Sequence, residues 1–291
     1  GPKGSEGMKK EWHGYLFIAP LLLGCLVFTG IPFVLVMRYS VFQGAGVHLR
    51  FVGLENYAQA FQNSSFALAF GNSMRFLAAG LPLVMAAAYL TALLLKSQAK
   101  KYALLKSVLL FPYIMPVAAT VLLAEGIFGK AGGLDWLLSL LGLPGANWLD
   151  GPLGFWAAVL LYLWKSTGYA VILLLAGLVT IPEEQYESAQ LDGASAFQKF
   201  RYITTPQMWY PVFFALIFSL INAFKCFREI FLIGGQHPSD SLYMLQHFIN
   251  NSFENLNYAN LSVSSILLLA VILLFFGVFY GFVSRKERYR E

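Results

Sequence analysis

Long apolar runs alternate with short polar connections along the whole chain. The first run, residues 14–37, contains no charged residue and exceeds the roughly 20 residues that cross the hydrocarbon core of a bilayer. A run of this length without a small-residue cleavage site is not a secretory signal peptide. Five more runs of similar character lie at 66–95, 102–128, 153–181, 208–233 and 261–283. The pattern predicts an all-α polytopic membrane protein with six transmembrane helices.

The composition supports this interpretation. Hydrophobic residues make up 58% of the chain and charged residues only 12%, about half the fraction found in soluble domains. The mean hydropathy is +0.62. These values exclude an ordinary cytosolic enzyme, a disordered protein and a disulfide scaffold. Residues 1–7 (GPKGSEG) precede Met8 and are expected to be a tag remnant, so that the transmembrane domain is 8–291.

The net charge of +5 is explained by topology. Lys and Arg are enriched in cytoplasmic connections of membrane proteins. In this chain, twelve Lys and Arg residues lie in the segments on the side of the membrane that holds both termini and the loop 180–206, and three lie on the other side. We therefore expect both termini and this loop in the cytoplasm, with no nucleic-acid partner. The twelve are Lys9, Lys10, Lys96, Lys100, Lys101, Lys106, Lys199, Arg201, Arg285, Lys286, Arg288 and Arg290, and the three are Arg38, Arg50 and Lys130.

Motifs for catalysis or metal binding are missing. There is no phosphate-binding G-x-x-x-x-G-K-[ST] sequence; Lys165-Ser166-Thr167 resembles its end but lacks the upstream glycine. The four histidines are scattered, and the two cysteines, Cys25 and Cys226, lie far apart in apolar runs. We expect no catalytic residues, no metal site and no cofactor in this chain.

The loop 180–206 carries helix signals. Thr180 and Glu183 are spaced as a capping box around Pro182, and a short helix is predicted over 183–191. Asp192-Gly193 would break it, and a second helix over 194–202 would end before Thr205-Pro206. Small residues would let another protein approach the backbone closely; an ordinary helical hairpin between spans is the alternative. These small residues are Ser188, Ala189, Gly193, Ala194 and Ala196.

This loop resembles the EAA loop of binding-protein-dependent ABC importer permeases, whose pattern is roughly E-A-A-x-x-D-G-A followed by F-x-x-I-x-L-P. The chain departs from it at Ser188 and Thr205. Similar matches at 15–20, 51–57, 111–116, 175–178 and 234–235 extend the resemblance over nearly the whole chain, most closely to the maltose-type F permease branch. The matching loop residues are Glu187, Ser188, Ala189, Asp192, Gly193 and Ala194.

The resemblance implies a type I ABC importer permease fold in the inner membrane and a role in sugar import, with an oligosaccharide as the expected substrate. The loop would be a coupling helix inserted into a cleft of an ATPase subunit. The implied partners are a second homologous permease, two ATPase subunits that bind ATP and Mg, and an extracytoplasmic sugar-binding protein. A self-sufficient secondary transporter or channel is the alternative, although the chain has no clear internal repeat.

The resemblance also implies a sugar site on the third, fourth and fifth spans. Aromatic faces and polar side chains suit a sugar, whereas core packing is the alternative for each aromatic residue. The register of the fifth span relative to the family pattern is not fixed by the sequence. Asn222 and Lys225 are therefore alternatives to Ser219 and Ala223 as polar contributors. The implied positions are Tyr113, Val117, Tyr162, Ser166, Ser219, Ala223 and Cys226.

Ionisable residues within spans are candidates for function because isolated charge is costly there. Lys225 and Glu229 are four residues apart and could pair within one helix, whereas Arg228 and Glu229 should each find other partners. Lys225 and Arg228 would suit an acidic sugar or a phosphate. The candidates are Arg75, Glu125, Lys165, Lys225, Arg228 and Glu229.

The outer connections are 41–65, 129–152 and 234–260. The last contains apolar residues spaced as one helix face, which predicts either a helix on the membrane surface or a docking platform for a partner. These residues are Leu242, Leu245, Phe248 and Ile249.

Overall fold

The computed structural model describes residues 4–44, 49–96, 103–146 and 148–287, with side chains over 15–44, 49–96, 106–146 and 148–281. Residues 1–3 of the expected tag remnant lie outside this part, as do Lys100, Lys101, Arg288 and Arg290. Six segments of the described chain are helical, long and apolar enough to cross a membrane, as predicted. They are Tyr15–Val41, Ser64–Leu95, Val117–Leu140, Leu153–Val179, Trp209–Gly234 and Tyr258–Gly281.

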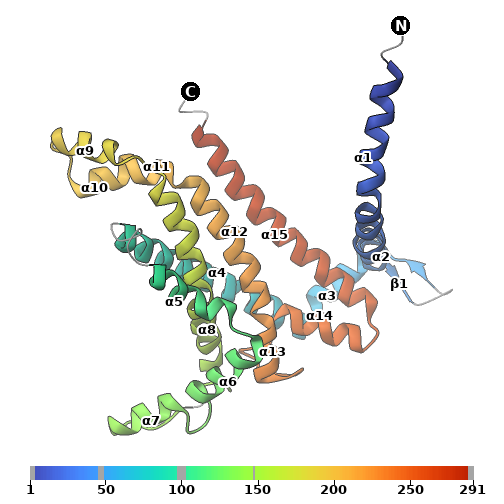
Figure 1. Cartoon of the computed structure of the whole chain (residues 1–291). Coiled ribbons are helices and arrows are strands. Elements are labelled where there is room, and N and C mark those ends of the chain that lie inside the picture. Colours follow the sequence, from blue (N-terminus) through green and yellow to red (C-terminus); the bar gives the residue numbers. More distant parts are fainter. Residues whose placement is uncertain (1–3, 45–48, 97–102, 147, 288–291) are drawn as a thin grey trace. The chain divides into compact units, whose positions relative to one another are not determined.

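The chain divides into two compact units. Unit 1, residues 1–64 and 249–271, contains the helices α1 (Gly4–Cys25), η1 (Leu26–Gly30), α2 (Ile31–Val41) and α3 (Glu55–Gln62); Figure 1 labels α1, α2 and α3. The short strands β1 (Phe42–Gln43) and β2 (Arg50–Phe51) pair antiparallel after α2. The Asn56 amide donates hydrogen bonds of 3.0 Å to the carbonyl oxygens of Ser40 and Phe42. This amide therefore ties α3 to the end of the first span.

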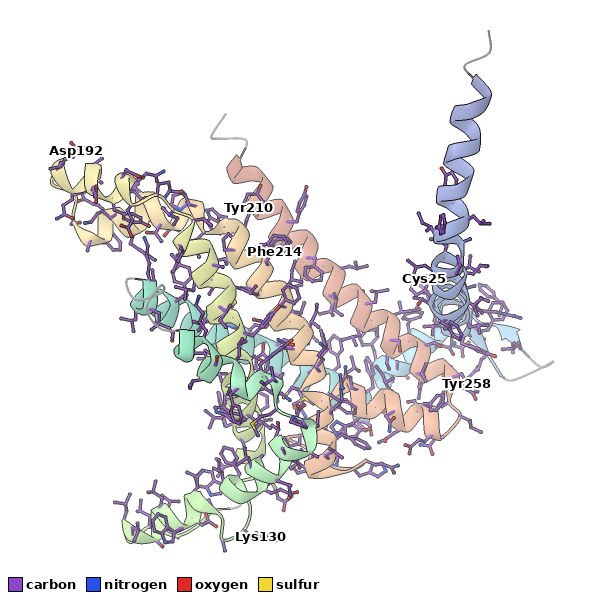
Figure 2. The ribbon with its side chains drawn as sticks, viewed as in Figure 1. Cys25, Lys130, Asp192, Tyr210, Phe214 and Tyr258 are labelled. Atoms are coloured by element: carbon purple, nitrogen blue, oxygen red, sulfur yellow. The ribbon has the colours of Figure 1, made fainter. Side chains whose placement is uncertain are left out.

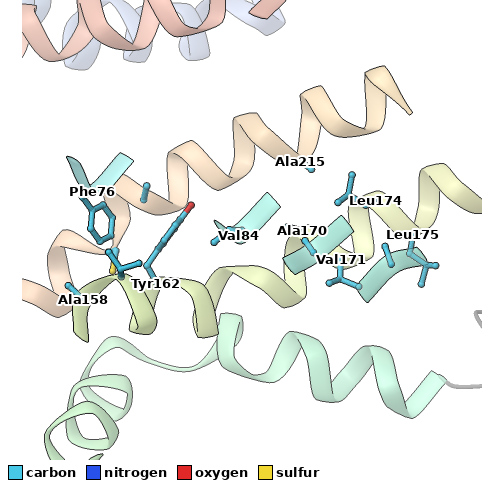
Figure 3. Packing of buried hydrophobic residues seen from close by; sticks show 14 of the residues in the cluster. Phe76, Val84, Ala158, Tyr162, Ala170, Val171, Leu174, Leu175 and Ala215 are labelled. Carbon is cyan, nitrogen blue, oxygen red and sulfur yellow. The ribbon is translucent and has the colours of Figure 1, made fainter. Parts of the chain in front are cut away.

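Unit 2, residues 65–248 and 272–291, is built around α8 (Leu153–Val179). Apolar side chains of α8 pack against α4 (Ser64–Leu95) and α12 (Trp209–Lys225), and Figure 3 shows Val84 and Ala215 in this cluster. α8 also packs closely on α5 (Ala103–Ile114). A Cβ added at Gly168 would overlap the carbonyl oxygen of Leu109, so only glycine permits this approach.

The prediction of one helical span over 102–128 was wrong. The helix stops at Ile114 and restarts as α6 (Val117–Phe128) because Pro116 is extended, with φ −58° and ψ 145°, and has no N–H to continue the ladder. α5 and α6 have 12 residues each, or about 18 Å, and neither crosses the ~30 Å hydrocarbon core. The apolar helical stretch continues instead through a turn into α7 (Gly133–Leu140).

The prediction of a membrane-surface helix or docking platform after the fifth span was also wrong for most of its apolar face. Leu242, Leu245 and Phe248 are buried within unit 2. The backbone N–H of Leu245, where α14 (Leu245–Glu254) begins, donates to Ser73 Oγ at 2.8 Å, and Phe248 packs on Phe66. The apolar face is therefore internal packing against α4. The last span is part of α15 (Tyr258–Glu287).

Candidate functional site

The hairpin between the fourth and fifth spans begins with α9 (Glu183–Leu191), which has the predicted bounds. Gly193 has φ +80° and donates its N–H to Gln190, while Ala194 donates to Ala189 at 2.9 Å. These two bonds form a Schellman motif, which requires the left-handed conformation that glycine adopts freely. The predicted break at Asp192-Gly193 is thereby confirmed.

The predicted capping box at Thr180 was wrong. The Thr180 hydroxyl donates to the Gly177 carbonyl at the end of α8, and α9 has no side-chain cap. The capping box occurs later in the hairpin, where Ser195 Oγ accepts from the Gln198 N–H and Gln198 Oε1 accepts from the Ser195 N–H at 2.7 Å.

The second half of the hairpin is longer than predicted. α10 (Ala196–Lys199) continues through a π turn, η4 (Phe200–Thr204), into α11 (Thr205–Gln207) before α12 begins. Pro206 does not end the helix because it lies in the first turn of α11, where its missing N–H costs nothing.

The base of the hairpin is fixed to the spans. Tyr186 Oη shares a 2.9 Å hydrogen bond with Thr204 Oγ1 across the hairpin. The Lys96 ammonium, at the end of the second span, lies 3.7 Å from the centroid of the Tyr186 ring. Ile181 and Met208, which flank the hairpin, are buried in the core cluster. Motion of the hairpin would therefore be transmitted to α4, α8 and α12.

The tip of the hairpin projects beyond the ends of α8 and α12, and Figure 2 labels Asp192 at its extremity. Leu191 at the end of α9 is 90% exposed, and Phe197 on α10 is 72% exposed. Sequence reasoning missed both, although apolar side chains in a short polar hairpin are an available signal. The six residues predicted for the loop all lie on α9 or its turn; Ala189 and Ala194 are half-buried and Glu187, Ser188, Asp192 and Gly193 are exposed.

A polar cavity of about 210 Å³ lies among α5, α6, α8, α12 and α13 (Phe227–Gly234). Seven of the nine side chains named for the substrate path, counting the fifth-span alternatives, line it, together with three further ionisable residues predicted within the spans. The lining residues are Tyr113, Val117, Tyr162, Lys165, Ser166, Asn222, Lys225, Cys226, Arg228 and Glu229.

Helical spacing explains why these residues converge. On α8, Tyr162, Lys165 and Ser166 are three and four residues apart and share one face. Tyr113 and Val117 flank the break between α5 and α6, so this break lies at the cavity wall. The Tyr113 ring stacks on Tyr169 with 4.6 Å between centroids.

Ser219 and Ala223 do not line the cavity. The Ser219 carbonyl accepts a 2.8 Å hydrogen bond from the Tyr162 hydroxyl, and its own hydroxyl points to Met85. Ala223 is buried in the core cluster. Of the alternatives on the fifth span, Asn222 and Lys225 are therefore the residues that face the cavity.

The cavity contains an interhelical ion pair. Lys165 on α8 is paired with Glu229 on α13, so the carboxylate does not pair with Lys225 within its own helix. Glu229 is 3% exposed, and its Oε2 has no hydrogen-bond partner among the described residues. The prediction that Glu229 finds a partner other than Arg228 is confirmed.

A larger hollow of about 820 Å³ lies among α4, the start of α8 and the segment near Asp240. Its lining is mostly apolar, with Arg75 as the ionisable span residue that faces it. Glu125 lines neither hollow. By size alone the larger hollow would be the candidate ligand-binding site. The convergent polar groups that orient a small ligand, however, are found in the smaller cavity. Within the described part of the chain, no group of three His, Cys, Asp or Glu residues could hold a metal.

Comparison with known proteins identifies the family. Residues 85–289 match the family described as "Binding-protein-dependent transport system inner membrane component". The chain belongs to this family. It is 33% identical over 284 residues to the trehalose/maltose transport system permease protein MalF of Thermococcus litoralis, covering 94% of each chain. It is 29% identical to the lactose transport system permease protein LacF of Rhizobium radiobacter, covering 94% of this chain and 95% of that one.

The fold of this permease also matches a solved structure. That structure is a bacterial alginate ABC transporter in complex with an alginate pentasaccharide-bound periplasmic protein. The TM-score is 0.81 at 21% identity, and 98% of both chains is covered. The expected ABC importer permease fold is thereby confirmed, and the chain is a multi-pass membrane protein.

Proposed function

We propose that this chain is the transmembrane permease subunit of an ATP-driven importer that moves a sugar, in particular an oligosaccharide, into the cell. The observation that carries the proposal is a fixed hairpin with an exposed apolar tip on a family member whose relatives are named for sugar transport. In this proposal both termini and the hairpin face the cytoplasm, in agreement with the distribution of Lys and Arg.

The hairpin would act as the coupling element to an ATPase subunit. Leu191 and Phe197 expose apolar surface, and burial of this surface in a cleft of the ATPase subunit would be favourable. The Schellman turn and the Tyr186–Thr204 hydrogen bond make the element stiff. A stiff element held at both ends by spans can convert closure of two ATPase subunits into a rearrangement of α8 and α12, with no chemistry of its own.

The polar cavity would form this subunit's part of the sugar path. Tyr113 offers an aromatic face, and Ser166 and Asn222 offer hydrogen-bonding groups for hydroxyls. The remaining partners in this proposal are a second homologous permease, two ATPase subunits that supply ATP and Mg chemistry, and an extracytoplasmic sugar-binding protein. The binding protein follows from the family description, the ATPase subunits from the need for an energy source outside this chain, and the second permease from the resemblance of the loop to the EAA loop.

Co-purification from native membranes tests the coupling role. We expect the wild-type chain to bring down an ATPase and a second permease, identified by mass spectrometry. Leu191→Arg should release the ATPase and keep the second permease, because the substitution changes only the exposed tip. Leu54→Arg is the matched control, since Leu54 is 74% exposed but lies before α3. Retention of the ATPase by Leu191→Arg would contradict this role for the tip.

A further inference from the structure

The charges around the polar cavity do not balance. Three cationic side chains, Lys165, Lys225 and Arg228, line it together with a single carboxylate, Glu229. The formal charge of the lining is therefore positive by two. All four residues lie within the fourth and fifth spans, where an uncompensated charge is costly and normally faces a partner, a water-filled path or a substrate.

The one carboxylate is already engaged. Glu229 is buried and is paired with Lys165, which is itself only 17% exposed. Lys225 and Arg228 are exposed residues on the cavity wall and have no acidic partner among the side chains that the structure describes. The two cations that remain free are thus the two that a ligand entering the cavity can reach.

The rest of the lining suits a sugar ring. Tyr113 supplies an aromatic face, and Asn222 and Ser166 supply neutral hydrogen-bonding groups. The volume of about 210 Å³ is smaller than the roughly 300–1,000 Å³ of ordinary ligand pockets. The cavity therefore has room for part of an oligosaccharide, with two cations beside that part.

We propose that this cavity binds a sugar residue that carries a carboxylate, as a uronic acid does, with Lys225 and Arg228 as its counter-charges. The inference rests on the proposed function and names the substrate class within it. A guanidinium can hold a carboxylate through two parallel hydrogen bonds, and an ammonium adds a point charge. Glu229 is paired with Lys165, so this carboxylate does not compete with a ligand for the two free cations.

Binding of two matched trisaccharides tests the proposal. Trigalacturonate and the neutral maltotriose are measured by equilibrium dialysis against the whole transporter in nanodiscs, without the binding protein. We expect trigalacturonate to bind at least 10-fold more tightly than maltotriose, with the preference weakening as salt is added. Lys225→Gln and Arg228→Gln should each reduce the preference several-fold, and Lys225→Arg should retain it. Lys130→Gln, at an exposed turn after α6, is the control and should change nothing.

Equal binding of the two sugars, unaffected by the charge variants, would overturn the inference. If Tyr113→Ala then weakens binding of both sugars, the cavity remains a sugar site and the proposed function stands. A loss of the second permease from Lys225→Gln or Arg228→Gln preparations would show that the cations meet a carboxylate of that subunit, which also overturns the inference. Absence of binding by either sugar overturns it too, and ATP-dependent uptake then decides the proposed function independently.

Discussion

Lys165 on α8 and Glu229 on α13 form an ion pair between residues 64 positions apart in the sequence. The pair joins the central helix of unit 2 to the end of the fifth span at the wall of the polar cavity. It fixes the position of the cavity's one carboxylate and leaves Lys225 and Arg228 free.

Removal of one partner of this ion pair should destabilise the folded protein more than replacement of both partners by apolar residues. Lys165→Met alone leaves a buried carboxylate without its cation, which typically costs about 3–5 kcal/mol. Lys165→Met combined with Glu229→Leu removes both charges and should recover most of this stability. Thermal unfolding in detergent measures both variants. Equal destabilisation by the single and the double variant would contradict the pairing.

Gly168 should tolerate no side chain. A Cβ at this position would meet the Leu109 carbonyl oxygen, so Gly168→Ala forces α5 away from α8 and should cost about 1–3 kcal/mol or more. Gly71→Ala on α4 is the matched control, because its Cβ would meet nothing within 4 Å. We expect the control to be neutral or slightly stabilising in the same unfolding experiment. A stable Gly168→Ala protein would show that the two helices are not in this close contact.

Gly193 should be replaceable by asparagine better than by alanine. Its φ of +80° costs an alanine about 1–2 kcal/mol, whereas asparagine visits the left-handed region more readily. ATP-dependent uptake and ATPase retention should therefore fall for Gly193→Ala and recover in part for Gly193→Asn. The opposite order would indicate that side-chain size at the tip, and not the turn conformation, limits coupling.

His247 should make the segment after the fifth span sensitive to acid. Burial lowers the pKa of His247 to about 4, with a smaller contribution from His237, and the side chain lies in α14 outside the membrane-spanning segments. Its Nδ1 accepts the Met244 N–H and its ring packs on Phe227. Between pH 6.5 and pH 4 the unfolded chain binds a proton that the folded chain does not. Stability should therefore fall as the pH falls, by about 2 kcal/mol at pH 5.

Hydrogen exchange of α14 at pH 7 and pH 5, corrected for the intrinsic exchange rate, measures this effect. A His247→Gln variant should lose most of the pH dependence. Undiminished protection of the wild-type segment at pH 5 would contradict the burial of a neutral imidazole.

The sequence predicted the spans well because apolar length is a local property. Hydropathy located five of the six membrane-spanning segments of the described chain to within a few residues, and the Asp192-Gly193 turn could be recognised from residue type alone. The errors arose where tertiary contacts decide the outcome. Pro116 splits the third predicted span, and the apolar face around Leu245 packs on α4 instead of facing a membrane.

The cavity was predictable only in part for the same reason. Residues at three- and four-residue spacing on α8 could be assigned to one face, but the choice between Asn222 and Ser219 on α12 depends on the rotation of that helix in the packed unit. The pairing of Lys165 with Glu229 joins two spans and is not encoded in any local pattern. Leu191 and Phe197 could have been noticed as apolar residues in a polar hairpin, but the structure is needed to show that both are exposed on it.

Reconstituted uptake tests the central claim most directly. One set of proteoliposomes contains the chain with its co-purified ATPase and second permease, and the other contains the chain alone. Sugar-loaded binding protein is supplied at the extracytoplasmic face and ATP at the cytoplasmic face. The account predicts ATP-dependent uptake only for the complete assembly, and its loss with Leu191→Arg while Leu54→Arg transports normally. Uptake by the chain alone, or full uptake by the Leu191→Arg assembly, would contradict it.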